Sequence, residues 1–127
     1  VRGYDLVVAD VPRVARDPVA EETLSRSLLA VLLVPERVQA VAAARHVLAR
    51  VHERCSTVVA VSVAASGGTG PAAVGDVLAV PVVARLRRER GIGQAVEAGR
   101  GPGGSRRWRR GARSVLDVLG LEPAVGP

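Results

Sequence analysis

The sequence predicts an α/β protein with a mainly parallel sheet of about four strands and flanking helices. Two observations support this fold class. Segments of helical periodicity alternate with mainly apolar runs, which favours parallel strands joined by right-handed crossovers, and 127 residues suffice for one modest core. The runs that predict strands span residues 6–9, 28–34, 57–63 and 80–86. We expect one domain over residues 1–119 and a loose tail over residues 120–127.

The first apolar run is Leu6 to Ala9, and it ends at Asp10. A run that is apolar on both faces suits a central parallel strand, so we expect it to be buried between helices. Pro12 stops the strand because proline cannot donate to a ladder. Open α/β sheets bind ligands at the carboxyl ends of their strands, which makes Asp10 a candidate binding residue. The alternative is that Asp10 caps the following turn.

Two helices are expected in the first half of the chain. Asp17 and Pro18 predict the start of a short helix that ends near Ser27, because aspartate caps helices and proline suits the first helical position. The clearest helix spans residues 36–54, where apolar residues recur at helical spacing and form one face. The apolar run 28–34 between these helices predicts a buried strand.

The second half is expected to hold two short helices, over residues 72–78 and 91–98, and a terminal helix over residues 105–119. Trp108 lies with other apolar residues on one side of the terminal helix, and arginines lie on the other side. We therefore expect Trp108 to pack against the domain while the arginines face water.

The positive charge of the chain is concentrated near this terminal helix. Residues 85–113 hold ten arginines and two acids, a net charge of +8, and the rest of the chain holds eight arginines and ten acids, a net charge of −2. These values sum to the +6 of the whole chain. A basic block can bind nucleic acid or anionic lipid, and the candidates are Arg106, Arg107, Arg109 and Arg110. The alternative is a solvated surface in a protein whose basic residues are all arginine.

Cysteine content and hydropathy predict a cytoplasmic protein, with peripheral attachment to a membrane as the alternative. A single cysteine, Cys55, excludes an internal disulfide and fits a reducing compartment. No apolar run reaches the ~18 residues of a membrane span, and no signal peptide is visible. Because the chain starts in mid-pattern and without methionine, we expect an N-terminal part to precede Val1.

The segment around Asp10 resembles the Walker B segment of the MinD/ParA/CpaE branch of P-loop ATPases. In that family a tyrosine–aspartate pair precedes a hydrophobic strand, and an aspartate, an apolar residue and a proline follow it. The corresponding residues here are Tyr4-Asp5, the run Leu6 to Ala9, and Asp10-Val11-Pro12. Within this branch, the chain is most similar to the CpaE-like septum site-determining proteins of actinobacteria.

The order of the later segments is also similar to the second half of a MinD/CpaE-type domain. There a strand that ends near valine and proline, a long helix, a further strand and a strand near L-x-x-P-V follow Walker B. The corresponding features here are Val34-Pro35, the helix over 36–54, the strand over 57–63 and residues 78–82, with residues 90–95 similar to the run before the last helix. The resemblance implies the C-terminal portion of a partial, doubly wound P-loop NTPase-like domain.

A glycine-rich stretch over residues 66–72, S-G-G-T-G-P-A, follows a predicted strand and precedes a predicted helix. This is the setting in which backbone N–H groups and a helix N-terminus bind phosphate. Pro71 stands where the family has its lysine, Ala72 stands where it has a hydroxyl residue, and the chain contains no lysine. In the family the phosphate loop also precedes Walker B. We therefore expect a connecting loop here.

The resemblance implies nucleotide binding only for the full-length protein. There, ATP and Mg²⁺ would bind with the help of an N-terminal phosphate loop, and Asp10 would hold the metal or its bound water. The chain lacks the lysine and also the asparagine that the family uses near its third strand. We therefore expect a degenerate or incomplete ATPase, and no cofactor for this chain alone.

The function that the resemblance implies is septum-site determination and regulation of cell division, or assembly of pili or secretion systems. The alternative is a non-enzymatic α/β interaction module whose arginine-rich surface binds nucleic acid or acidic lipid. We expect a protein partner or a homodimer, with nucleic acid or a membrane surface as further partners. A receiver domain of the response-regulator type is disfavoured because it needs a lysine.

Overall fold

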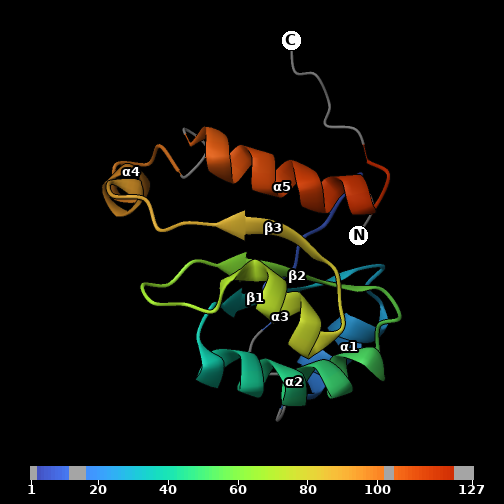
Figure 1. The fold of residues 1–127 in the computed structure, drawn as a ribbon. Helices are drawn as coiled ribbons and strands as arrows, with labels where there is room; N and C mark the ends of the chain where they lie inside the picture. The colour runs from blue at the N-terminus through green and yellow to red at the C-terminus, as the bar shows by residue number, and fades with distance from the viewer. Residues whose placement is uncertain (1–2, 12–16, 102–104, 122–127) are drawn as a thin grey trace.

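The computed structural model describes residues 3–11, 17–101 and 105–121, and it confirms an α/β fold with a parallel sheet (Figure 1). Within these residues the sheet has three strands, in the spatial order β1-β2-β3. Each strand pairs in parallel with the next, and their bounds are β1 (Ala30–Pro35), β2 (Val58–Val63) and β3 (Val82–Leu86).

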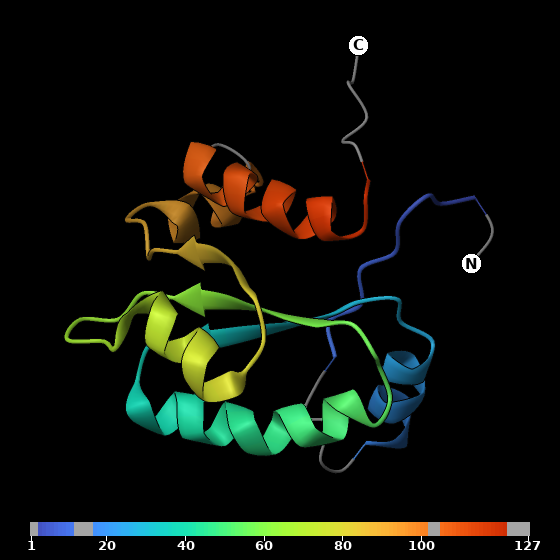
Figure 2. The same cartoon turned by 45° about the vertical axis from the view of Figure 1, so that its right-hand side comes forward.

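Helices pack on two sides of this sheet. Helices α2 (Val38–His52) and α3 (Gly70–Leu78) connect successive strands and lie on the same side. Helix α5 (Arg106–Val118) lies on the opposite side, next to β3 (Figures 1 and 2). The short helices α1 (Pro18–Ser25) and α4 (Ile92–Glu97) precede β1 and α5, respectively. This order agrees with the strand–helix alternation that the sequence predicts.

The hydrophobic core lies between the sheet and the helices α2 and α3. Alternate residues of β1 and β2 point into it, because successive side chains of a strand leave opposite faces of the sheet. The apolar face of α2, which the sequence predicts from its helical spacing, covers these residues. The buried members from these elements are Ala30, Val34, Val58 and Ala60 from the strands and Val41, Leu48, Val51, Val74 and Leu78 from the helices.

Helix α1 begins where the sequence predicts. The side chain of Asp17 accepts a hydrogen bond from the N–H of Val19 at 2.9 Å, so aspartate caps the helix. Pro18 follows at the first helical position, where a missing N–H leaves no hydrogen bond unmade. Leu24 is buried in the core and holds this helix against the domain.

The first predicted strand, Leu6 to Ala9, is not formed. Residues 3–11 take part in no strand pairing, so the sheet of the described residues has three strands rather than four. Leu6, Val7 and Val8 are 41%, 57% and 85% exposed, which contradicts the expected burial between helices. An apolar run is buried only where other elements cover it, and the helices that cover the sheet pack on β1, β2 and β3.

Helix α5 docks on β3 through a glycine. Gly111 is buried, and a Cβ atom placed on it would lie 2.9 Å from Leu86 Cδ2 and 3.7 Å from Ala84 Cβ. Ser105 caps this helix by accepting a hydrogen bond from the N–H of Trp108 at 3.2 Å. Trp108 is half-buried and the arginines of the helix are exposed. The predicted helix with one packed side and one arginine-rich side is therefore confirmed.

Replacing Gly111 by valine is expected to loosen α5 from the sheet, because the Cβ atom alone would lie 2.9 Å from Leu86 Cδ2 and valine adds two methyl groups to it. Overpacking of this kind lowers the free energy of unfolding by about 1–3 kcal/mol. Urea unfolding followed by Trp108 fluorescence measures this change, and a red-shifted emission marks an undocked helix. Ala112→Val is the matched control because Ala112 is exposed on the same helix. Equal stability of the two variants would contradict docking through Gly111.

Candidate functional site

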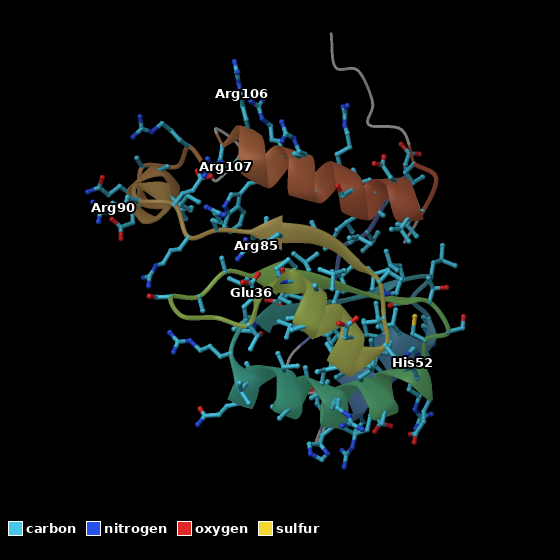
Figure 3. All side chains as sticks on the ribbon, in the orientation of Figure 1. Glu36, His52, Arg85, Arg90, Arg106 and Arg107 are labelled. Carbon is cyan, nitrogen blue, oxygen red and sulfur yellow. The ribbon has the colours of Figure 1, made fainter. Side chains whose placement is uncertain are left out.

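A buried ionic cluster lies at the carboxyl end of the sheet. Glu36 directly follows β1, Ser62 lies in β2 and Arg85 lies in β3. The guanidinium of Arg85 donates to both carboxylate oxygens of Glu36, from Nε to Oε1 and from Nη2 to Oε2, at 2.7 Å each. Ser62 Oγ donates to Oε1 of the same carboxylate at 3.0 Å. Figure 3 labels Glu36 and Arg85 at this end of the molecule.

Strand pairing brings these three residues together. Ser62 and Arg85 are Cα partners in the register of β2 and β3, so their side chains leave the same face of the sheet. The N–H of Glu36 donates to the carbonyl oxygen of Val63 at 2.9 Å. This bond carries the β1–β2 pairing one residue beyond β1, and it holds the carboxylate beside Ser62.

The environment keeps Glu36 ionised. Glu36 is 1% exposed, whereas the side chain of Arg85 is 38% exposed. The hydrogen bonds from Arg85 lower the pKa of Glu36 below its ordinary value; burial acts against them, and the Ser62 hydroxyl and the charge of Arg87 support them. The same pair raises the pKa of Arg85. An ionised carboxylate whose oxygens are occupied suits a structural ion pair and not a general acid.

The loop between β2 and α3 closes over this cluster. The N–H of Thr69 donates to the carbonyl oxygen of Glu36 at 3.0 Å, and the N–H of Gly68 donates to that of Ala65 at 3.0 Å. A Cβ atom on Gly68 would lie 2.5 Å from the Glu36 carbonyl oxygen, so only glycine permits this approach. These two loop N–H groups thus donate to carbonyl oxygens of the protein itself, and Pro71 has no N–H group. This geometry agrees with the predicted connecting loop.

Asp10, the residue with the Walker B resemblance, takes no part in the hydrogen bonds of the Glu36 cluster. It is exposed in the extended segment 3–11, and no hydrogen bond or ion pair to another described residue holds it. In the described part of the chain, no group of three histidine, cysteine or acidic side chains could hold a metal ion. The assignment of Asp10 to a magnesium site therefore stays a prediction.

Nine of the ten arginines of the predicted basic block form a second polar feature, which we call the arginine surface; the tenth, Arg85, is paired with Glu36. All its members are exposed, and the ion pairs among the described residues involve none of them. Figure 3 places the labelled members Arg90, Arg106 and Arg107 toward the same end of the molecule as Arg85. The arginine surface comprises Arg87, Arg88, Arg90 and Arg100 before α5 and Arg106, Arg107, Arg109, Arg110 and Arg113 on α5.

Sequence reasoning identified the arginine surface but missed the Glu36 cluster. Glu36 was expected only as the first residue of a helix, whereas the helix begins at Val38 and Glu36 closes the sheet. A signal was present, because Ser62 and Arg85 are polar residues inside otherwise apolar strands. Polar residues in a buried strand need a partner, so each could have been flagged, although the sequence does not say which partner it takes.

No protein-family model matches the chain, and neither the curated proteins nor the solved structures contain a match. Among the described residues, none of the helices combines the length and the apolar character that crossing a membrane requires.

Replacing Glu36 by glutamine is expected to lower the free energy of unfolding at pH 7 by about 1–3 kcal/mol, because the charged pair with Arg85 is lost. The lowered pKa of Glu36 also sets the pH dependence. Its stabilisation is complete above the unfolded value, about 4.3, and is lost as the pH falls through the folded value. Glu36→Gln should therefore lose less stability than the unsubstituted chain as the pH falls below about 4.3.

Urea titrations at these pH values test this prediction. Glu22→Gln is the matched control, because Glu22 forms an exposed ion pair with Arg26 four residues along α1. Such pairs contribute about 0.3–0.5 kcal/mol. If the two variants lose equal stability, or if Glu36→Gln has the same acid dependence as the unsubstituted chain, the ion pair has no special role in holding the sheet.

Proposed function

We propose that this chain is the C-terminal portion of a MinD/CpaE-like α/β domain. In this proposal it acts without hydrolysing ATP, in septum-site determination and regulation of cell division or in pilus or secretion assembly. The order of elements after Asp10 supports the proposal most: the parallel strands β1-β2-β3 and the connecting helices α2 and α3 follow the order that the resemblance implies. Pro35 ends β1 and Pro81 directly precedes β3, as in the family pattern.

An uncovered apolar surface beside β1 also supports a role as part of a larger domain. Val31 and Leu33 of β1 are 38% and 65% exposed, and no described strand pairs with the outer edge of β1. Leu6, Val7 and Val8 are exposed as well. Parallel sheets are normally covered on both faces. In the proposed arrangement, the remainder of the domain covers β1 and residues 6–8.

The residues of this chain do not fit a nucleotide or magnesium site by themselves. Asp10 is exposed, and among the described residues no group of three histidine, cysteine or acidic side chains could hold a metal ion. The N–H groups of Gly68 and Thr69 in the glycine-rich loop already donate to the carbonyl oxygens of Ala65 and Glu36, and the chain contains no lysine. The proposed contribution of this chain is therefore to build and present a surface, and ATP and Mg²⁺ belong to the complete domain.

The isolated chain is expected to release no phosphate from ATP above a control without protein, because it has no lysine to reach the terminal phosphates. A coupled phosphate assay with ATP and Mg²⁺ measures this rate. Steady release that Asp10→Ala abolishes would show that the chain holds a working ATPase site, and the proposal of a non-hydrolysing portion would be wrong.

A fluorescent fusion in an actinobacterial host tests the proposed cellular role. We expect the fusion to concentrate at division septa or at envelope sites of pilus or secretion assembly. Leu33→Lys should disperse it, because this substitution places a charge on the apolar surface of β1. Val19→Lys on α1 is the matched control, since Val19 is 69% exposed, close to the 65% of Leu33. Uniform fluorescence of the unsubstituted fusion would count against the proposed role.

A further inference from the structure

Helix α5 presents a row of guanidinium groups on one side. Arg106, Arg110 and Arg113 are spaced by four and three residues, so they lie on the same side of the helix at axial intervals of about 6 and 4.5 Å. Arg107 and Arg109 flank this row, and all five side chains belong to exposed residues. Asp117 is the acid of this helix, and because it follows Arg113 by four residues it lies on the same side, at the C-terminal end of the row. The side of α5 that faces away from the sheet is therefore strongly cationic.

The arginine row is joined to the arginines that precede the helix. Ser105, the cap of α5, donates from Oγ to Glu89 Oε1 at 2.8 Å. This bond ties the start of α5 to the segment after β3, which carries Arg87, Arg88 and Arg90. It also occupies Glu89, one of the two acids within residues 85–113. This bond thus holds the segment that carries Arg87, Arg88 and Arg90 at the start of α5, where Arg106 and Arg107 lie.

The packing of α5 argues against insertion into a lipid layer. Helices that lie in a membrane interface bury an apolar side among the acyl chains. In α5 the apolar side already packs on β3: Gly111 packs against Leu86 and Ala84, and Trp108 is half-buried. What remains accessible along the row is guanidinium, which recognises phosphate oxygens through paired N–H donors.

We propose that the arginine surface binds the phosphate backbone of duplex nucleic acid without reading its sequence. A rigid row of guanidinium groups on a docked helix can contact successive phosphates, and such contacts position a protein but carry no sequence information. Helix α5 cannot recognise adenine through a side-chain amide, because it has no glutamine and the chain has no asparagine. Single strands are disfavoured, since Trp108 is packed and Tyr4 is the other aromatic residue. This proposal stands independently of the proposed function.

Fluorescence polarisation with a labelled duplex DNA of mixed sequence tests the proposal. Each phosphate that an arginine neutralises releases counterions, so four engaged arginines predict a slope of about −3.6 for the logarithm of affinity against the logarithm of salt concentration. This slope corresponds to a loss of affinity of about 150-fold between 50 and 200 mM salt. A second duplex of unrelated sequence should bind with the same affinity.

Two charge-matched double variants locate the binding surface. Arg106→Gln with Arg110→Gln removes two members of the row, and the slope should become less negative by about 1.8. Arg37→Gln with Arg45→Gln removes the same charge from two exposed residues, the N-cap of α2 and a residue within α2. Helix α2 lies across the sheet from α5 (Figure 1). The control should keep the slope of the unsubstituted chain. Far-ultraviolet circular dichroism verifies that both variants fold.

Three results would overturn the proposal. The first is absence of binding to duplex DNA at 50 mM salt. The second is an equal change of slope in the two double variants, which would assign the binding to net charge and not to the arginine surface. The third is binding to vesicles of anionic phospholipid with no binding to DNA, which would make acidic lipid the ligand.

Discussion

The ion pair between Glu36 and Arg85 is the constraint on which the carboxyl end of the sheet depends. A carboxylate that is 1% exposed must be paired, and Arg85 supplies two hydrogen bonds to it across the middle strand. The pair therefore links the residue after β1 to β3, while Ser62 of β2 donates from between them. The loop that carries Gly68 then packs over the backbone of Glu36.

The same register determines where α5 is placed. Because side chains alternate along a strand, turning Arg85 toward Glu36 turns its neighbours Ala84 and Leu86 to the opposite face. Gly111 of α5 packs on these two residues. The cationic side of α5 then faces away from the sheet. The buried ion pair and the arginine surface are thus two consequences of one strand register in β3.

The chemistry of this end of the molecule favours binding over catalysis. Glu36 has a lowered pKa, and both its carboxylate oxygens accept hydrogen bonds, so it is not a proton donor at neutral pH. In the glycine-rich loop, the N–H groups of Gly68 and Thr69 donate to backbone carbonyl oxygens of the protein and so are not available to a ligand. Among the described residues, the guanidinium groups of the arginine surface and, on β1, the side chains of Val31 and Leu33 are exposed.

Local signals in the sequence determined the α/β class, the start of α1 at Asp17 and Pro18, and the two-sided character of α5, because each depends on residues within a few positions of one another. Only the tertiary structure decided the rest. Leu6 to Ala9 is as apolar as a buried strand, yet it is exposed, since burial depends on what packs against a segment. Glu36 meets Ser62 and Arg85 across 26 and 49 residues of chain. The register of the strands decides which residues become partners, and the register cannot be predicted from residues that are neighbours in the sequence.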